Sequence, residues 1–469
     1  MGLLFLAVFG VLTGYAIVYF EPASRWAVPG LLLTGLAFVI RPLWIVGALL
    51  SVATLRLVWQ AGEGIAPLEL AYSLTFLLLL ARTFLRHGFV AASDGEKETF
   101  KSPIALPLIV FLLLAGCTAV LAFLQGHAFV AWASDLNMIL FYAFYFVIVG
   151  ATRSPQELDR VFIALSLVTA FAVFRSAYEE ISTRSFEFVL YGETVIKFPI
   201  ASAFSLILFF VLLSIVLFMR QKNEKWFFLV LLCILFGVHQ ILASVRSRWL
   251  GAIAALMAIF LVTSPPQKGR FLRPLSFLAL CLTFLLAVSL TVPALFQNPA
   301  LDFMQMIQKR FATIFKGRAD PTTEARFLEW KAAVKEIRDH PWLGSGLGKG
   351  VAYFDTTLYH PRTVTTRYIH NSYLFFLLNM GWVGLLAFLW LCVSFVFYGL
   401  RVFHSVEDPY YKGMVLGCWS AFIALLVAAF AGASLNDSAL TIWAGFLMGT
   451  VTVIDRQKKV GKEKTSGLA

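Results

Sequence analysis

The sequence predicts an all-α polytopic membrane protein, and three observations support this prediction. Of the 469 residues, 60% are hydrophobic and 14% are charged, whereas soluble domains average about 45–50% apolar and about 25% charged residues. Apolar runs long enough to cross a bilayer recur along the chain. The alternating pattern, with a length of about ten residues, that marks a transmembrane barrel is not visible. We therefore expect about 12–14 transmembrane helices.

The apolar runs define the expected organisation of the chain. They lie at about 2–20, 27–40, 43–59, 66–85, 103–124, 132–150, 161–177, 198–219, 226–244, 249–264, 275–292, 372–398, 412–432 and 439–454. The first run lacks a basic leader and is interpreted as a retained span rather than a cleaved signal peptide. We expect four parts: N-terminal helices in 1–197, central helices in 198–292, one large extracytoplasmic loop in 293–371, and C-terminal helices with a basic tail in 372–469.

Basic residues predict the orientation. The net charge of +12 does not indicate a nucleic-acid partner, because most lysines and arginines lie in short loops between spans, where positive charge marks the cytoplasmic side. Such loops contain Arg41, Arg82, Arg153, Arg220, Lys268, Arg401 and the tail from Arg456 to Lys464. Both termini are therefore expected in the cytoplasm, and the large loop on the opposite side.

A few basic residues lie at the outer ends of expected spans, where this rule does not place them: Arg175, Arg184, Lys197, Arg246 and Arg248. A cation at the membrane surface is costly unless it is paired or bound to a ligand, so each is a candidate functional residue. For the first three, snorkelling or pairing with nearby glutamates explains the position as well as a ligand does.

Arg246 and Arg248 belong to the connection Ser244-Val-Arg-Ser-Arg-Trp249, which contains no acidic residue. Two guanidiniums at the level of lipid headgroups fit an anionic partner, and a diphosphate matches their bidentate geometry. This connection is therefore a candidate anion site.

The large loop contains a predicted amphipathic helix from Arg326 to Asp339, whose apolar face would comprise Phe327, Trp330, Val334 and Ile337. Thr322 or Thr323 is the expected N-cap. Arg326 in the first turn has two interpretations: an ion pair with Glu329 at i+3, or a ligand contact near the helix N-terminus.

Four alternating glycines follow this helix: Gly344, Gly346, Gly348 and Gly350. They lack the spacing of a nucleotide-binding loop, which favours a series of turns with positive φ. The five cysteines form no C-x-x-C pair and lie in apolar runs, so they are interpreted as small core residues rather than metal ligands.

His370 stands where the loop enters an apolar helix, followed by the potential N-caps Asn371 and Ser372. It is a packing or capping residue, a metal ligand, or a general base with an unperturbed pKa of about 6.5. Metal binding is disfavoured because His340 and His360 do not complete a ligand spacing. The residues alone do not decide whether His370 is a packing residue or a general base.

Three stretches together resemble the O-antigen ligase / O-antigen polymerase superfamily of bacterial membrane glycosyltransferases. They are Ser244-Val-Arg-Ser-Arg-Trp-Leu-Gly251, Glu324-Ala-Arg-Phe-Leu-Glu-Trp330 with His340-Pro-Trp-Leu-Gly-Ser-Gly346, and His370-Asn-Ser-Tyr-Leu374 with Gly381-Trp-Val-Gly-Leu385. Their order and placement match that superfamily over about residues 200–450. The glycine that usually follows the arginine of the first motif is Trp249 here, so either Arg246 or Arg248 fits that position.

The resemblance implies an enzyme of the bacterial inner membrane, active at its periplasmic face without metal or cofactor. It would transfer a glycan from a polyprenyl-diphosphate donor to a hydroxyl of lipid A–core or, in polymerases, of another lipid-linked glycan. Carried over, Arg248 or Arg246 together with Arg326 would bind the diphosphate, and His370 would be the base. Tyr368, Asn371 and Tyr373 would orient the histidine or line the sugar groove. Arg175 and Arg184, singled out by their position at the ends of spans, are further candidates for supporting roles.

Two alternatives remain at this stage. A polymerase of the same superfamily differs from a ligase in its acceptor, and the motifs do not separate the two. A flippase of polyprenyl-linked glycans would also need outward arginines, but it predicts internal repeats and charges at the membrane midplane. The best such polar residues are Asp135 and Asn137.

Overall fold

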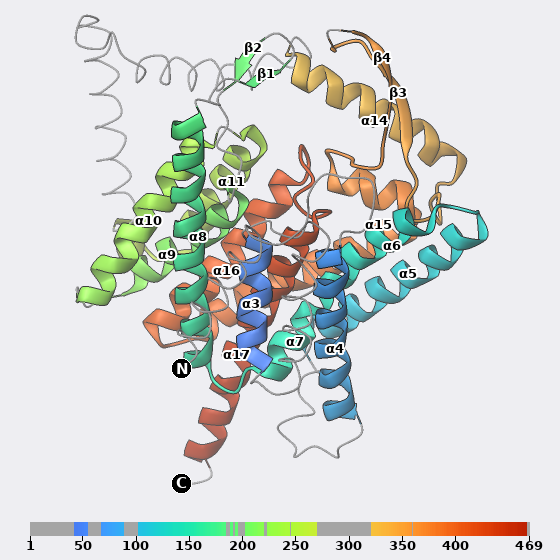
Figure 1. Cartoon of the computed structure of the whole chain (residues 1–469). Helices are drawn as coiled ribbons and strands as arrows, with labels where there is room; N and C mark the ends of the chain where they lie inside the picture. Colours follow the sequence, from blue (N-terminus) through green and yellow to red (C-terminus); the bar gives the residue numbers. More distant parts are fainter. Residues whose placement is uncertain are drawn as a thin grey trace, which may run out of the picture.

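The structure is a computed structural model that describes residues 42–54, 67–88, 102–183, 188–190, 193–195, 202–219, 223–243, 245–269, 320–358 and 360–466. Helices dominate these residues (Figure 1): α3 (Pro42–Thr54), α4 (Pro67–Gly88), α5 (Ala105–Leu124), α6 (Phe129–Leu140), η2 (Phe141–Ala143), α7 (Phe144–Ala151), α8 (Pro155–Thr183), α9 (Ser202–Phe218), α10 (Glu224–Leu242), α11 (Arg246–Val262), α14 (Pro321–Asp339), α15 (Ser372–Ser405), α16 (Pro409–Ala428) and α17 (Ser438–Ser466). Two short antiparallel pairs are also present: β1 (Phe188–Leu190) with β2 (Glu193–Val195), and β3 (Val351–Asp355) with β4 (Arg362–Thr366).

The expected all-α membrane class is confirmed. Among the described residues, 6 helices are long and apolar enough to cross a membrane: Ala105–Leu124, Phe129–Ala151, Glu224–Ile241, Ser372–Ser405, Pro409–Ala428 and Ser438–Lys458. The expected segments 2–20, 27–40 and 275–292 lie outside the described residues, as does the first part of the large loop. The expected segment 132–150 consists of α6, the 3₁₀ turn η2 and α7.

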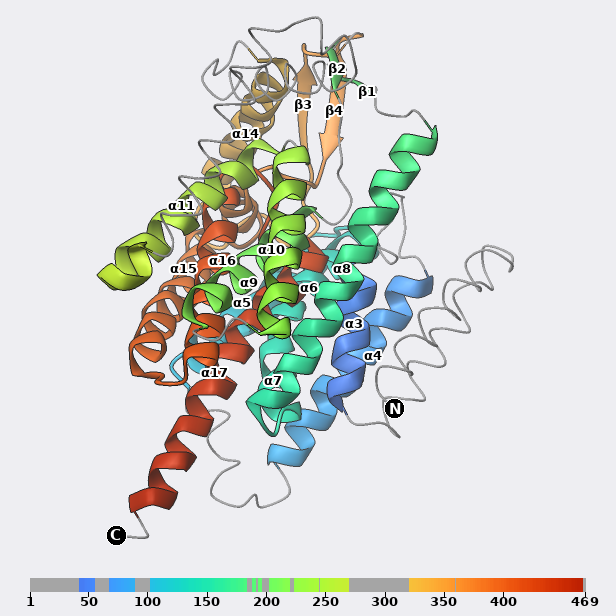
Figure 2. The same ribbon diagram turned by 90° about the vertical axis from the view of Figure 1, so that its left-hand side faces the viewer.

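The segments outside the helical bundle lie at two opposite ends of the molecule. The helix α14 and the strands β3 and β4 lie at one end, and the last turns of α17 project from the other (Figures 1 and 2). At the α17 end, the Arg456 Nη2 atom donates a hydrogen bond to the Thr152 carbonyl oxygen at 2.8 Å. The basic tail and the loop that follows α7, which the charge rule predicts on the same face of the membrane, therefore contact each other.

Close helix packing builds the core around α16. On this helix, Gly413 and Gly417 have the four-residue spacing that lets membrane helices approach closely. A Cβ atom at either position would collide with the backbone of α9, at Ile215 and Val211 respectively. Four cysteines fall within the described residues and are free, and three of these are buried: Cys233, Cys392 and Cys418.

The helix α15 is broken, whereas the sequence predicts one continuous helix there. Gly381 has φ 63° and ψ −168°, a conformation essentially restricted to glycine. The turn that follows α14 supplies the missing hydrogen bonds. The Trp382 amide donates to the Pro341 carbonyl at 2.9 Å, and the Ser345 amide donates to the Leu378 carbonyl at 2.8 Å. Backbone groups left unpaired in a membrane cost several kcal/mol each, so this turn and the break in α15 stabilise each other.

We expect Gly381→Ala to destabilise the protein by about 2–5 kcal/mol, because alanine disfavours this backbone conformation and would overpack the site. The added Cβ would collide with the Trp342 carbonyl. The melting temperature of the detergent-solubilised protein measures the effect. The matched control is Gly116→Ala in α5, where a Cβ atom would meet no neighbour within 4 Å. Equal melting temperatures for the two variants would contradict this account of the break.

Candidate functional site

The site is built on α14, which begins one residue after its N-cap, Asp320. The Asp320 side chain accepts a hydrogen bond from the Thr323 amide at 3.0 Å, so the expectation of a threonine cap was wrong. An aspartate is equally suited to this position, and the following Pro321 favours the first helical turn.

The buried face of α14 also differs from the predicted one. It consists of Ala325, Glu329, Ala333 and Ile337, whereas Phe327 and Val334 are exposed. The two alanines allow the helix to approach its neighbours closely, and the aromatic residues lie beside this face rather than on it. Consequently Glu329, expected at the surface, is buried.

Glu329 binds His370, and this contact connects α14 to the entrance of α15. The Glu329 Oε1 atom accepts from the His370 backbone amide at 2.6 Å, and Oε2 contacts the His370 Nδ1 atom at 2.8 Å. The side chain of Glu329 is 3% exposed and that of His370 is 39% exposed. The imidazole is therefore fixed on its Nδ1 side and accessible from outside.

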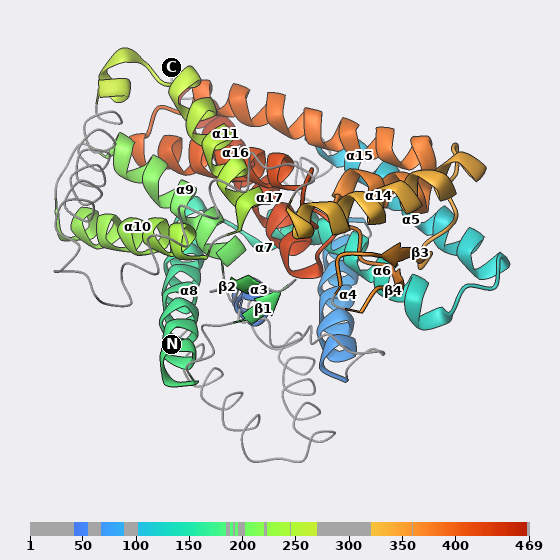
Figure 3. The ribbon, with the colours of Figure 1, turned by 90° about the horizontal axis from the view of Figure 1, so that it is seen from above.

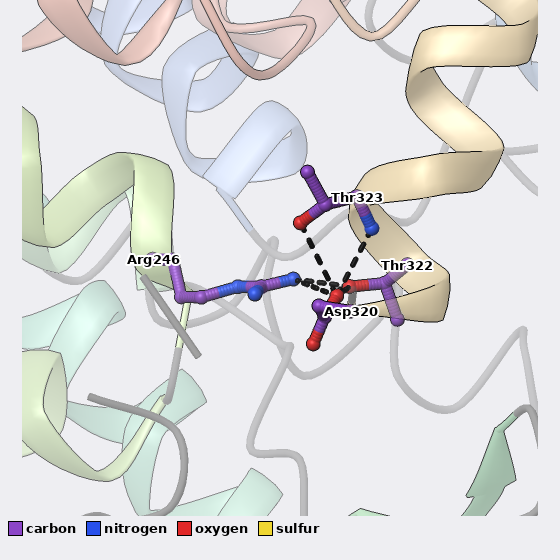
Figure 4. Close-up of polar contacts among 4 residues, drawn as sticks. All are labelled: Arg246, Asp320, Thr322 and Thr323. Carbon is purple, nitrogen blue, oxygen red and sulfur yellow. Dashed lines mark hydrogen bonds and ion pairs between the residues drawn. The ribbon is translucent and has the colours of Figure 1, made fainter. Parts of the chain in front are cut away.

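Arg246 is paired with the cap of α14, although no acid lies near it in the sequence. Its Nη2 atom contacts the Asp320 Oδ1 atom at 3.0 Å and also donates to the Thr322 hydroxyl (Figure 4). Burial raises the pKa of Asp320, but the hydrogen bonds from Thr322 and Arg246 and the charge of Arg246 outweigh it, so that this pKa lies below its ordinary value. The expectation that Arg246 lacks an acidic partner was wrong.

Arg326 lies between these two contacts. Burial lowers the pKa of Arg326, and the nearby charge of Arg246 lowers it further, while Glu329, Tyr368 and Asp320 oppose the shift. An arginine nevertheless remains protonated in proteins. Among the described residues, Arg326 has no hydrogen bond or ion pair, so the predicted ion pair with Glu329 does not form: that carboxylate bonds His370 instead.

Viewed from above, α14 extends from the start of α11 toward β3 (Figure 3), and it packs against α15 and β3. Arg246 at the start of α11, Arg326 on α14 and His370 before α15 thus belong to one end of the molecule and are linked through Asp320 and Glu329. Tyr368 adds a further link, because its ring contacts the His370 ring edge-to-face with centroids 4.9 Å apart.

Arg248 follows Arg246 by two positions on α11, and residues at this spacing do not face the same way. Its charge acts on His239 of α10, whose Nδ1 atom contacts the Ser205 hydroxyl of α9 at 2.8 Å. Arg175 is exposed on α8, and Arg184 and Lys197 lie outside the described residues. The structure therefore brings Arg246 beside Asp320 and Arg326.

Asn371 and Tyr373 have structural contacts. Asn371 is the N-cap of α15, where its side chain accepts from the amides of Tyr373 and Leu374. Of the two expected caps, Asn371 and Ser372, the structure therefore has the first. The Tyr373 hydroxyl donates to the Leu426 carbonyl of α16 at 2.8 Å. Asn371 therefore fixes the first turn of α15, and Tyr373 holds this turn, which follows His370, against α16.

The glycine run forms turns, as its pattern predicts. Gly344, Gly346 and Gly348 have φ values of 74°, 78° and 79°. The Gly348 amide donates to the Asp135 carboxylate of α6 at 2.8 Å, and His127 binds the Leu347 carbonyl. These turns fasten the segment after α14 to the α5–α6 hairpin.

Sequence reasoning missed two residues of this site, Glu329 and Asp320. The spacing Ala325-x₃-Glu329-x₃-Ala333-x₃-Ile337 was a usable signal, because it places an acid within a helical stripe of small and apolar residues. No signal of this kind marked Asp320, whose partner Arg246 is 74 residues away. Within the described residues there is no group of three or more metal-ligating side chains.

A known protein family matches the part of the chain that contains this site. Residues 231–389 match the family model described as O-antigen ligase, a range that includes α11, α14 and the first part of α15. No curated protein matches the chain.

Proposed function

We propose that this chain, which carries a domain of the O-antigen ligase family at residues 231–389, transfers a glycan from a polyprenyl-diphosphate donor to an acceptor hydroxyl. One observation carries the proposal: two guanidiniums and an accessible imidazole, distant in sequence, meet at one end of the helical bundle. The guanidiniums fit a diphosphate, and the imidazole fits a base for a hydroxyl.

The proposed reaction is a direct displacement. The acceptor hydroxyl oxygen forms a bond to the anomeric carbon of the donor glycan, and its proton passes to the His370 Nε2 atom. The bond between that carbon and the diphosphate oxygen breaks, and the polyprenyl diphosphate leaves with the electron pair. Attack opposite the leaving group inverts the anomeric configuration.

Arg246 and Arg326 stabilise the negative charge that develops on the leaving diphosphate. Fixed cations in a partly buried site act strongly because their orientation costs nothing at the moment of reaction. Arg246 is fixed by Asp320, and Arg326 is partly buried beside it. The two charges can replace the neutralising role of a metal ion, so we expect transfer to proceed in the presence of a chelator.

We place the reaction at the periplasmic face of a bacterial inner membrane. The support is electrostatic: α17, whose last turns include the basic residue Arg456, projects from the end opposite to α14 (Figure 2), and basic segments next to spans stay in the cytoplasm. Apolar side chains such as Leu386 and Phe397 are exposed on α15, and a surrounding bilayer would cover them. The polyprenyl chain of the donor would reach the site from the lipid phase, with the glycan outside.

The polar residues that would favour a flippase have structural partners. Asp135 accepts from the Gly348 amide at 2.8 Å, and the Asn137 amide donates to the Ser73 hydroxyl at 2.8 Å. Both side chains are therefore held by contacts within the protein, whereas a transporter needs a polar group at the membrane midplane that is available to its substrate. We therefore prefer a glycosyltransferase, and a ligase onto lipid A–core over a polymerase because one large loop, 293–371, carries the α14 motif and leads directly to His370.

The deciding experiment incubates the purified protein with a polyprenyl-diphosphate glycan, a chelator, and either lipid A–core or a second lipid-linked glycan. A ligase attaches one glycan to lipid A–core, whereas a polymerase yields a ladder of lipid-linked products. Movement of the donor across vesicles without a new glycosidic bond would instead support the flippase and refute the enzyme.

A further inference from the structure

We propose that Glu329 is a positioning residue that sets the tautomer of His370, leaving the His370 Nε2 atom unprotonated to accept the proton of a sugar hydroxyl. The inference deepens the proposed function and rests on it for the role of Nε2. The tautomer itself follows from the geometry of Glu329 and His370.

Both oxygens of Glu329 bind the same residue. Oε1 contacts the backbone amide of His370 at 2.6 Å, and Oε2 contacts the ring Nδ1 atom at 2.8 Å. An ionised carboxylate accepts hydrogen bonds but cannot donate them. His370 must therefore be the donor in both contacts, so its ring carries a proton on Nδ1. A neutral imidazole with Nδ1–H has a lone pair on Nε2.

The surroundings leave Nε2 accessible. The side chain of His370 is 39% exposed, and its Nε2 atom forms no hydrogen bond to any described residue. The Tyr368 ring contacts the imidazole edge-to-face, which restricts rotation of the ring about its side-chain bonds. Nδ1 is held and Nε2 is presented, which is the arrangement that a general base for a hydroxyl requires.

The position of Glu329 on α14 accounts for its fixed orientation. It lies on the buried face of the helix between Ala325 and Ala333, and small neighbours allow the backbone before α15 to approach. The nearby charge of Arg326 also acts on this carboxylate. When His370 takes up a proton, Glu329 becomes the counter-ion of the imidazolium. Its carboxylate is already in place, so no group has to move to stabilise the new positive charge.

Glutamine is the informative substitution, because it keeps the shape of glutamate but has only one acceptor group. If the amide oxygen accepts from the His370 backbone amide, the amide nitrogen faces Nδ1 and must donate to it. That bond requires a lone pair on Nδ1, which moves the ring proton to Nε2. In the Glu329→Gln variant, Nε2 would therefore be a donor and could not accept a proton.

We expect Glu329→Gln to lower kcat by about 10²–10⁴-fold while KM for the donor changes by less than about threefold. Glu329→Asp keeps the carboxylate and should recover part of the rate. The matched control is Glu336→Gln, on the same helix. Its carboxylate pairs with Lys349 at 2.6 Å and does not contact His370, so we expect its kcat to stay near that of the unmodified protein.

Nitrogen-15 NMR of histidine-labelled protein tests the tautomer without any assay of transfer. The signals of His370 are those absent from a His370→Gln variant. We expect a protonated Nδ1 and a bare Nε2 in the unmodified protein, and the reverse in Glu329→Gln. An unchanged tautomer in Glu329→Gln, with or without loss of activity or thermal stability, would overturn the inference and reduce Glu329 to a structural contact.

The two proposals fail in distinguishable ways. If the unmodified protein forms no glycosidic bond but the His370 tautomer reverses in Glu329→Gln, the proposed function is wrong and the positioning role stands. If transfer occurs and Glu329→Gln retains the full rate, the function stands and the inference is wrong.

Discussion

Replacing His370 by alanine is expected to lower the rate of glycan transfer by about 10²–10⁴-fold, the range in which general acid–base catalysis contributes. The imidazole is the accessible end of the pair with Glu329, and alanine leaves no group to take the proton of the acceptor hydroxyl. Transfer of a labelled glycan under single-turnover conditions, with purified protein and saturating donor, measures the chemical step separately from binding.

Two comparisons make this result specific. His404→Ala removes an exposed histidine at the end of α15 remote from the site, and its transfer rate should not change. Binding of the donor to His370→Ala should persist, because the diphosphate contacts of Arg246 and Arg326 remain. An undiminished single-turnover rate in His370→Ala would exclude His370 as the base and leave it as a packing residue.

The second large effect is expected at the arginines. Arg246→Ala and Arg326→Ala should each lower kcat/KM for the donor by about 10²–10³-fold, as expected when one preorganised donor to a developing anion is lost. Lysine at either position should restore only part of the activity, because it keeps the charge but not the bidentate geometry. Initial rates measured as a function of donor concentration give kcat/KM.

Arg248 and Arg401 provide the comparison. Arg401 lies at the far end of α15, exposed, and Arg401→Ala should leave kcat/KM unchanged. Arg248→Ala should have a smaller effect than Arg246→Ala, because Arg246 is the residue that contacts Asp320 at the start of α14, whereas the charge of Arg248 acts on His239 of α10. If all four variants behave alike, the diphosphate does not bind between α11 and α14.

Arg246 also illustrates a limit of sequence reasoning. The connection from 244 to 249 contains no acid, and a search for local partners along the chain finds none. Its partner Asp320 is 74 residues away, at the start of a helix for which the sequence predicted a threonine cap. Position relative to the expected spans nevertheless marked Arg246 as exceptional, because a cation at a membrane surface is costly without a partner, and the structure supplies one in Asp320.

Helix α14 shows a related limit. Periodicity predicted a helix there, which the structure confirms, but the helix begins at Pro321, so Arg326 lies in its second turn rather than its first. The predicted apolar face was right for Ile337 but wrong for Phe327 and Val334, which are exposed. In the folded chain the small residues Ala325 and Ala333 face the interior, since close approach to α15 and β3 requires little side-chain volume.

The sequence by itself determined the membrane class, the helical elements of the loop, the cap at Asn371 and the candidate residues Arg246, Arg326 and His370. Each of these follows from local composition and spacing, which act over one or two helical turns. Tertiary structure alone decided that Glu329 holds His370 and that Asp320 holds Arg246. Both contacts join residues more than 40 positions apart, and such pairings depend on how α11, α14 and α15 pack, which short-range patterns do not specify.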